Sequence, residues 1–491
     1  MTDYQLFIDG VFCDASDGGR FDCVNPATGK RWASAPAATS SDTERAVAAA
    51  HRALRNGPWP EMTATQRGQM LFRLADLVAE HAHRLGSIEM TDSGKLAAET
   101  RSQTAYVAEY YRYYGGLADK IQGATLPIDK PNMHVFTRRE PIGVVAAIVP
   151  WNAAMFLTAT KLGPALAAGN TVVIKASEEA PAVMCEFAAL VEQAGFPAGV
   201  VNIITGFGEP CGRVLTSHPL VSRVAFTGGT TAASRVVANT ANNFAHVSLE
   251  LGGKSPILVF DDADMEGAVN GAIAGNFGAT GQSCVAGSRV LVQAGIHDEF
   301  LARLIERAKE IRIGDPLEDG TQMGPLATRA QLERIQQVVA ESEAQGAVVQ
   351  TGGKRPDGFD SGWYYEPTII SCMDQNTPST QVELFGPVMS VLRFEDERVG
   401  IGLANDSPFG LGAGVFTKDV ARAHRVAANI HSGIVWINTY RVISPIAPFG
   451  GFGQSGYGRE AGVDAIYDYT RTKTVWVNTS EEPMANPFVI R

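Results

Sequence analysis

The sequence predicts an α/β protein built on a doubly wound parallel sheet, and three observations indicate this. The 491 residues exceed what one small hydrophobic core can bury, so two or more domains are expected. Short apolar runs such as Thr171–Lys175 and Val201–Ile204 do not alternate with polar residues, which is typical of strands buried on both faces. Helix-like segments such as Ala182–Ala194 separate these runs, which is the order of βαβ units.

The N-terminal part of the chain predicts helices. Ser41–Leu54 and Thr65–Leu85 carry Ala, Leu and Val at helical spacing, with Ser/Asp or Thr at the start. Leu96–Tyr114 predicts a third helix, which ends at Gly115-Gly116.

The alternation of strands and helices then begins and predicts a first α/β domain. We expect strands at Val144–Val149, Thr171–Lys175, Val201–Ile204, Val221–Phe226 and Val247–Leu251, with helices between them that include Ala182–Ala194 and Glu209–Ser217.

The alternation restarts at about Gly252 and predicts a second α/β domain. We expect strands at Ile257–Phe260, Val290–Gln293, Val388–Phe394, Gly414–Thr417 and Ile434–Asn438, and helices near 264–276, 297–310, 329–345 and 418–430.

Two segments fit neither domain. Lys120–Glu140 is polar and contains proline, and Thr472–Asn478 alternates like an exposed strand. Edge strands of this kind often pair with another subunit.

The charge of the chain excludes some classes of function. Hydrophobic residues make up 45% of the chain and charged residues 19%, as in ordinary globular proteins. The net charge of −11, with Lys and Arg scattered, argues against binding of nucleic acid or an anionic membrane. Met1–Leu6 lacks the features of a secretory signal, and the longest apolar run, Ile142–Trp151, is too short to span a bilayer. We therefore expect a soluble cytoplasmic protein.

The six cysteines and nine histidines predict neither a disulfide framework nor a metal site. No Cys-x-x-Cys pair and no His-Glu-x-x-His spacing occurs. We interpret five of the cysteines as structural: Cys13, Cys23, Cys185, Cys211 and Cys372.

Cys284 differs from the other cysteines, because small residues surround it in Gly281-Gln282-Ser283-Cys284 and a substrate carbon can approach its sulfur. Upstream, Glu250 precedes Leu251-Gly252-Gly253, where a carboxylate can swing toward a reacting group. A thiolate nucleophile and a carboxylate that manages protons or water predict covalent chemistry on a carbonyl. An ordinary thiol is mostly protonated at pH 7, so the site must lower its pKa or supply a base.

Seven motifs in order make the chain resemble the NAD(P)-dependent aldehyde dehydrogenases over almost its whole length. They are Pro150-Trp151-Asn152, Lys175-Ala176-Ser177-Glu178, Phe226-Thr227-Gly228, Glu250-Leu251-Gly252-Gly253-Lys254, Gly281-Gln282-Ser283-Cys284, Glu383-Leu384-Phe385-Gly386-Pro387 and Pro448-Phe449-Gly450-Gly451.

The resemblance implies a three-part subunit that assembles as a homodimer or homotetramer. Residues 1–119 and 141–251 would form a doubly wound dinucleotide-binding domain, and 252–464 an α/β catalytic domain. Residues 120–140 and 465–491 would form a small β oligomerisation element, which accounts for the two segments that fit neither domain.

The resemblance also implies catalytic roles. Cys284 would attack the aldehyde, and the Asn152 amide and the Cys284 backbone N–H would donate to the oxyanion. Glu250 would activate the water that releases the acid, and its presence favours hydrolysis over transfer to coenzyme A. Lys161 and Glu460 would lie near a proton-exit path. The alternatives are a turn asparagine for Asn152, an exposed strand-end glutamate for Glu250, and a surface ion pair for Lys161 and Glu460.

The cofactor implied is NAD, with NADP left open. A carboxylate at Glu178 binds free ribose hydroxyls and repels a 2′-phosphate, although Ser177 or Lys175 could accommodate that phosphate. Gly208 lies in a glycine-rich turn whose third glycine comes too late for the GxGxxG spacing, and Gly228-Gly229 opens a helix that could face the pyrophosphate. The implied cofactor-binding residues are Trp151, Lys175, Glu178, Gly208, Phe226, Gly228, Gly229, Leu251, Glu383 and Phe385.

The resemblance implies a small-molecule aldehyde as the substrate, whose identity the sequence leaves open. Several residues after Asn152 and at 278–280 are small and predict a roomy entrance for a branched or ring-bearing aldehyde, with Phe156, Ile443 and Phe449 as apolar walls. Arg441 either pairs with the carboxylate of a semialdehyde or points to solvent, and we weight the two equally.

The residues argue against two other classes of function. One is an NAD-binding structural protein of the same fold without turnover, against which the joint presence of Cys284, Glu250 and Asn152 argues. The other is a thiol esterase, which ranks lowest because no histidine lies in the motifs.

Overall fold

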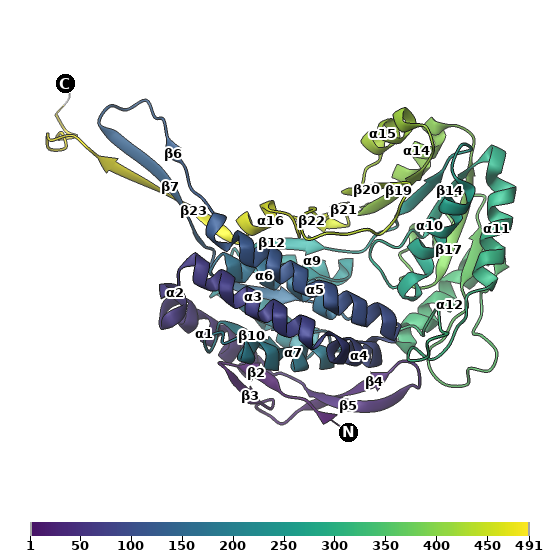
Figure 1. The fold of residues 1–491 in the computed structure, drawn as a ribbon, viewed down its shortest axis with the longest axis horizontal. Coiled ribbons are helices and arrows are strands. Elements are labelled where there is room, and N and C mark those ends of the chain that lie inside the picture. The colour runs from purple at the N-terminus through teal and green to yellow at the C-terminus, as the bar shows by residue number, and fades with distance from the viewer. Residues whose placement is uncertain (1, 490–491) are drawn as a thin grey trace.

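The computed structural model describes residues 2–489, and its largest element is an eight-stranded sheet (Figure 1). The five central strands are parallel, as the predicted βαβ order requires, and antiparallel strands flank them. In spatial order the strands are Gly456–Tyr457 (β22), His246–Glu250 (β12), Val221–Thr227 (β11), Val144–Ile148 (β8), Thr171–Lys175 (β9), Val201–Ile204 (β10), Leu6–Ile8 (β2) and Val11–Cys13 (β3).

Helices cover both faces of this sheet, so the doubly wound prediction is confirmed. One face packs on a core formed with Ser40–Arg55 (α1), Arg213–Ser217 (α8) and Thr230–Thr240 (α9). The helices that contribute to the core on the other face are Ala64–Glu80 (α3), Ala82–Ser93 (α4), Ala97–Leu117 (α5), Ala154–Ala167 (α6) and Ala182–Gln193 (α7).

A seven-stranded sheet forms the second α/β unit, at the right of Figure 1. Its strands, in spatial order, are Val348–Thr351 (β15), Thr368–Ser371 (β16), Val388–Phe394 (β17), Arg289–Gln293 (β14), Pro256–Val259 (β13), Gly412–Phe416 (β19) and Ile434–Ile437 (β20). Its main helices are Met265–Phe277 (α10), His297–Lys309 (α11), Arg329–Ala344 (α12), Glu397–Asn405 (α14) and Val420–Asn429 (α15).

The two segments that fit neither domain pair with each other. Met133–Pro141 (β7) lies antiparallel to Thr470–Asn478 (β23), and Thr125–Leu126 (β6) covers the other side of β7. This three-stranded arm projects from the body (Figure 1), and β23 is one of its two edge strands. The assignment of the arm to oligomerisation, and the boundaries of the three predicted parts, stay predictions.

Several local expectations were wrong. The single helix expected over Thr65–Leu85 is two helices, α3 and α4, because the backbone leaves the helical conformation at His81. Glu209–Ser217 is only partly α-helical, since Glu209 has an extended backbone before Pro210, which lacks an amide hydrogen. The N-terminal strands were not expected: Thr2–Asp3 (β1), Arg20–Asn25 (β4) and Lys30–Pro36 (β5) form a sheet of their own, and β2 and β3 extend the large one.

The remaining elements are short. They are Pro58–Glu61 (α2), Pro378–Gln381 (α13), Asp464–Tyr467 (α16), the paired strands Phe409–Gly410 (β18) and Phe452–Gly453 (β21), and the 3₁₀ turns at Ala118–Lys120, Gly278–Gly281 and Ala294–Ile296.

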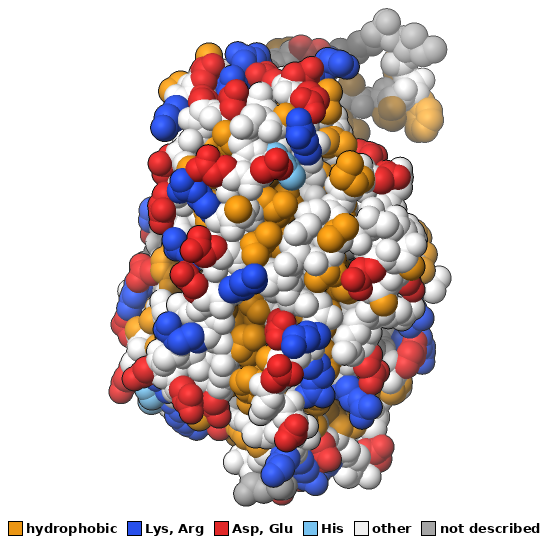
Figure 2. All heavy atoms as spheres, turned by 90° about the vertical axis from the view of Figure 1, so that its right-hand side faces the viewer, with side chains coloured by type: hydrophobic (Ala, Val, Ile, Leu, Met, Phe, Trp, Pro, Cys, Tyr) orange, Lys and Arg blue, Asp and Glu red, His pale blue; other side chains and the backbone are white. Residues whose placement is uncertain are grey.

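The surface carries charges of both signs. Figure 2 shows Lys and Arg interspersed with Asp and Glu on one face, around a band of hydrophobic side chains. Across residues 2–489, no helix combines the length and the apolar composition needed to cross a bilayer.

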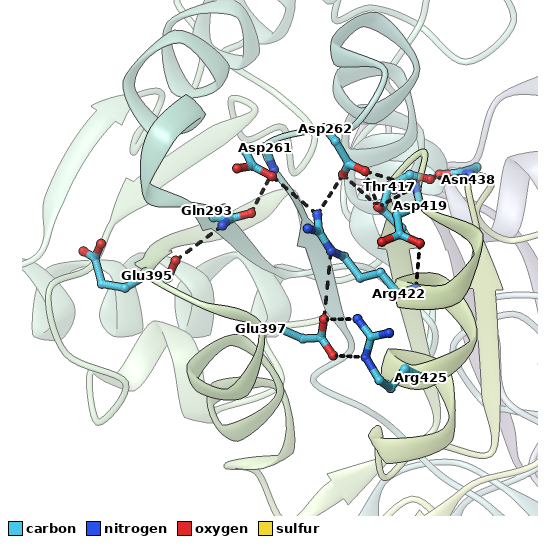
Figure 3. A network of polar contacts seen from close by, with 10 residues as sticks. All are labelled: Asp261, Asp262, Gln293, Glu395, Glu397, Thr417, Asp419, Arg422, Arg425 and Asn438. Atoms are coloured by element: carbon cyan, nitrogen blue, oxygen red, sulfur yellow. Dashed lines mark hydrogen bonds and ion pairs between the residues drawn. The ribbon is translucent and has the colours of Figure 1, made fainter.

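A network of polar contacts lies at the carboxyl ends of strands in the seven-stranded sheet (Figure 3). The Asp262 carboxylate accepts from the Thr417 hydroxyl at 2.7 Å, the Asp419 backbone N–H at 3.0 Å and the Arg422 guanidinium at 3.0 Å. Asp419 in turn caps α15. Burial pushes the pKa of Asp262 upward, but the hydrogen bonds from Thr417 and the charge of Arg422 outweigh it, so the pKa lies below its usual value.

We predict that Asp262→Ala lowers the melting temperature by roughly 2–8 °C, because it removes several hydrogen bonds at once. Asp261→Ala is the matched control and should have little effect, since Asp261 is half exposed and reaches Arg422 only at 3.4 Å. Because the Asp262 pKa is lowered in the folded state, the difference between Asp262→Ala and the parent should vanish as the pH falls through that pKa. Equal melting temperatures at pH 7 would contradict the prediction.

Candidate active site

The loop before Cys284 has an unusual backbone conformation. Ala279, Thr280 and Gly281 have φ values of 53°, 56° and 71°, so two residues with side chains adopt the left-handed region in succession. Such residues cost roughly 1–2 kcal/mol each. Hydrogen bonds to distant parts of the chain hold the loop: the Glu99 carboxylate accepts from the Ala279 backbone N–H at 3.1 Å, and the Thr280 hydroxyl donates to the Gly324 carbonyl at 3.2 Å.

The loop brings Cys284 next to Asn152. The Asn152 side-chain amide donates to the Gln282 carbonyl at 3.0 Å, and its second hydrogen is free for another acceptor. Cys284 and Asn152 line one cavity of about 150 Å³. The Cys284 backbone N–H donates to no protein acceptor among residues 2–489. The residues that carry these two donors and the sulfur therefore line one cavity.

Burial raises the pKa of the Cys284 thiol to about 12, and the nearby carboxylates of Glu383 and Glu250 add to the rise. The Arg441 guanidinium acts in the opposite direction. The thiol is therefore protonated at neutral pH in the protein alone, and a reaction at its sulfur needs a group that takes the proton.

Glu250 ends strand β12, but it is not the exposed strand-end residue of the alternative interpretation, because its side chain is only 3% exposed. Neither carboxylate oxygen has a hydrogen-bond partner in the described part of the chain. Burial, together with the charge of Glu460, raises its pKa well above the usual range. Glu250 does not line the Cys284 cavity and lies behind Gly450, where an added Cβ would come within 2.8 Å of its Oε1.

Lys161 and Glu460 form an ion pair, and the alternative of a surface pair is wrong because both side chains are buried. The Lys161 ammonium also donates to the Thr227 hydroxyl at 2.6 Å, and Glu460 also accepts from the Thr160 hydroxyl at 2.6 Å. Glu460 lines the Cys284 cavity, so this network connects the cavity to the interior of the large sheet.

A second cavity, of about 600 Å³, lies at the carboxyl ends of strands β8, β9 and β11. The Lys175 ammonium and the Glu178 carboxylate, 3.2 Å apart, lie on its wall. An added Cβ on Gly229 would meet no atom within 4 Å, so the backbone at the N-terminus of α9 is open to the cavity. Seven of the expected cofactor-binding residues line it: Trp151, Lys175, Glu178, Gly208, Phe226, Gly228 and Gly229.

The other three expected cofactor-binding residues do not line this cavity. The Phe385 ring meets the Trp151 ring edge to face at 5.5 Å, and Glu383 accepts from the Gly253 backbone N–H at 3.1 Å. Leu251 is buried, with its N–H bound to the Ser455 carbonyl. Burial raises the pKa of Glu383 to about 7, and the Gly253 bond and the charge of Lys254 limit the rise.

The walls of the Cys284 cavity match the sequence only in part. Phe156, Ile443 and Phe449 line it as expected, and so does Arg441, which also donates to the Ala274 carbonyl at 3.1 Å. Of the small residues that led us to expect a roomy entrance, Ala153 lines the cavity, whereas Ala154, Gly278, Ala279 and Thr280 do not. The reason given for a roomy entrance was therefore wrong.

Four residues at the site were not expected from the sequence: Glu99, Thr160, Thr227 and Gln103. Glu99, Gln103 and Thr160 lie outside the recognised motifs, and Thr227 lies in one without a role of its own. Each reaches the site only through tertiary contacts. Glu99 and Gln103 lie on α5, where polar residues at helical spacing predict only the exposed surface of a helix.

The chain matches the model of the aldehyde dehydrogenase family over residues 12–475. It is 56% identical, over 100% of both chains, to a (Z)-2-((N-methylformamido)methylene)-5-hydroxybutyrolactone dehydrogenase of Acinetobacter baylyi. It superimposes on betaine aldehyde dehydrogenase of Staphylococcus aureus in complex with NAD+ (TM-score 0.97, 38% identity, 99% of this chain and 96% of that one). An NAD+ complex of an aldehyde dehydrogenase from Bacillus cereus gives a TM-score of 0.95 at 40% identity, covering 97% of this chain and 96% of that one.

We predict that Lys161→Met lowers the free energy of unfolding by roughly 3–5 kcal/mol, because it leaves the buried Glu460 without its cation. The double variant Lys161→Met/Glu460→Gln should regain most of this loss, since no charge is then stranded. The midpoint of urea unfolding measures both. A single variant as stable as the parent would contradict the buried pair.

A further prediction concerns the thiol. Alkylation of Cys284 by iodoacetamide in the protein alone should accelerate about tenfold per pH unit between pH 7 and 9, because the thiolate fraction grows tenfold per unit below the pKa. Cys284→Ser gives the background from the other cysteines. A rate that is flat over this range would mean that the thiolate is already formed at pH 7.

Proposed function

The chain belongs to the aldehyde dehydrogenase family and is an enzyme of that class, and on this premise we propose that Cys284, Asn152 and Glu250 oxidise an aldehyde to its carboxylic acid with NAD. The observation that carries the assignment of residues is the shared cavity of Cys284 and Asn152, with the Glu250 carboxylate buried outside it and without a hydrogen-bond partner among residues 2–489. A structural role without turnover would not need an unpaired carboxylate kept at this cost.

In the proposed reaction the Cys284 sulfur forms a bond to the aldehyde carbon and the thiol proton leaves to a carboxylate. The free N–H of the Asn152 amide and the Cys284 backbone N–H donate to the oxyanion of the thiohemiacetal. After oxidation to the thioester, Glu250 takes a proton from water as the water oxygen attacks the carbonyl carbon. The carbon–sulfur bond then breaks, and the acid leaves. The raised pKa makes Glu250 a stronger base once it is ionised.

The second cavity, at the carboxyl ends of β8, β9 and β11, fits a dinucleotide. Its volume of about 600 Å³ and the open backbone at the N-terminus of α9 suit a pyrophosphate. Lys175 and Glu178 would bind ribose hydroxyls, and the Glu178 carboxylate favours NAD over NADP. Trp151, Gly208, Phe226, Gly228 and Gly229 would form the walls, and Leu251, Glu383 and Phe385 would support the nicotinamide end. When bound, NAD accepts the hydride from the substrate.

The arm supports a homo-oligomer. The edge of β23 offers unpaired backbone groups, and Trp476 on it is 59% exposed. We propose a homodimer or homotetramer that uses this edge, in the cytoplasm.

The substrate we propose is an aldehyde that carries a carboxylate, or its cyclic lactol form. Arg441 lines the same cavity as Cys284, where a guanidinium can pair with a carboxylate. The relative from Acinetobacter baylyi is named for a 5-hydroxybutyrolactone, which is the ring form of a four-carbon aldehyde acid. Both observations favour a semialdehyde over an unsubstituted aldehyde.

We predict that Glu250→Gln releases one equivalent of NADH per active site in a burst and then turns over roughly 10²–10⁴-fold more slowly, because the thioester forms but water is not activated. Rapid mixing with NAD and aldehyde, followed by NADH absorbance, measures both phases. Cys284→Ala is the control and should give neither phase. A Glu250→Gln variant with normal steady-state turnover would exclude Glu250 as the base.

A second prediction concerns Arg441. The parent should show a higher kcat/KM for succinic semialdehyde than for butanal, and Arg441→Ala should lower this ratio roughly 10- to 100-fold, as expected for a lost hydrogen bond to a charged group. Arg393→Ala, which removes a half-exposed arginine of β17 that does not line the Cys284 cavity, is the matched control. An unchanged ratio in Arg441→Ala would mean that Arg441 does not contact the substrate.

A further inference from the structure

Gln103 brings a polar amide to the cavity of the nucleophile. It lies on α5, and its side chain lines the same cavity as Cys284 and Asn152. Helix α5 belongs to the large sheet's helical layer, so this wall comes from a part of the chain far from the loop that carries the nucleophile. None of the recognised motifs includes Gln103.

A buried lysine fixes the amide. Lys95 is only 4% exposed, and its ammonium donates to Oε1 of Gln103 at 2.7 Å. Lys95 follows Gly94, which ends α4 in the left-handed conformation and lies against Pro325. The tight turn therefore holds the lysine in place while its charge stays inside the protein.

This contact determines which end of the Gln103 amide faces the lysine. An ammonium group has three donors and no acceptor, so the oxygen of Gln103 and not its nitrogen must face Lys95. The Nε2 group is then the other branch of the amide, and it makes no hydrogen bond to any of residues 2–489. Gln103 is thus preset as a donor of two N–H groups.

The surrounding apolar wall makes such a donor selective for ligands that carry a hydrogen-bond acceptor. Apolar and aromatic side chains dominate the cavity, among them Tyr110, Phe156, Leu157 and Phe449. An amide donor in such a wall loses hydrogen bonds to water when an apolar ligand enters and regains them only from a ligand that carries an acceptor. Sites of this design discriminate strongly against ligands that lack the acceptor.

We propose that Gln103 is a specificity-determining residue that donates from Nε2 to a carboxylate or carbonyl oxygen of the substrate remote from the aldehyde, and that Lys95 is the positioning residue that sets its orientation. The inference deepens the proposed function, on which it rests: the substrate class is an aldehyde with a second carbonyl-type oxygen, which Gln103 and Arg441 bind together.

The test compares two substrates of equal chain length in the full-length enzyme. For Gln103→Met, which keeps the length of the side chain but removes the amide, the ratio of kcat/KM for succinic semialdehyde to that for butanal should fall roughly 10- to 100-fold. Gln103→Glu should lower the ratio further, because a carboxylate repels the substrate's carboxylate. Lys95→Met should lower it less, since the amide remains but can turn. Gln336→Met, at an exposed glutamine of α12, is the matched control.

A binding measurement keeps this inference separate from the proposed function. Succinate, which cannot be oxidised at an aldehyde carbon, should slow alkylation of Cys284 in the parent, and the concentration needed should rise roughly tenfold in Gln103→Met. Melting temperatures of all variants verify folding. Equal loss of kcat/KM for both substrates, or unchanged protection by succinate, would overturn the role of Gln103. If no aldehyde yields NADH while protection still depends on Gln103, the proposed reaction fails and the role of Gln103 in binding stands.

Discussion

The active site depends on the contact that holds the left-handed loop of residues 279–281 against the helices of the large sheet. Ala279 and Thr280 would leave this conformation if nothing opposed them, because each costs roughly 1–2 kcal/mol. The carboxylate of Glu99 and the amide of Asn152 hydrogen-bond the loop on both sides of Gly281. An added Cβ on Gly281 would come within 2.1 Å of the Gly386 carbonyl oxygen, so the segment that precedes β17 of the seven-stranded sheet also confines the loop. The position of the Cys284 sulfur therefore follows from contacts between two sheets.

The site keeps ionisable groups in places where water cannot reach them. The Glu250 carboxylate is buried without a hydrogen-bond partner among residues 2–489, and Lys161 and Glu460 form a buried ion pair. Groups of this kind cost stability. The same burial raises the pKa of Glu250, which suits the base that we propose it to be. Glu250, Lys161 and Glu460 therefore cost stability at the site to which we assign the reaction.

Much of the fold could be predicted, because buried parallel strands leave a strong signal. The runs at Thr171–Lys175, Val201–Ile204 and Val388–Phe394 became strands with the expected bounds. The strands β1, β4 and β5 were missed, since their polar and small residues carry no run of β-branched side chains. The break at His81 was missed because the apolar spacing continues through it.

The sequence by itself determined the chemical groups: a cysteine among small residues, an amide after a buried strand and a glutamate beside glycines predict their chemistry from residue type and near neighbours alone. Only the tertiary structure decided how those groups behave. Burial, which is a property of the whole assembly of sheets, placed Glu250 away from the cavity, put Lys161 and Glu460 inside the protein and turned the Gln103 amide toward Lys95. Each of these results depends on residues distant in sequence, and no local pattern encodes which of them will meet.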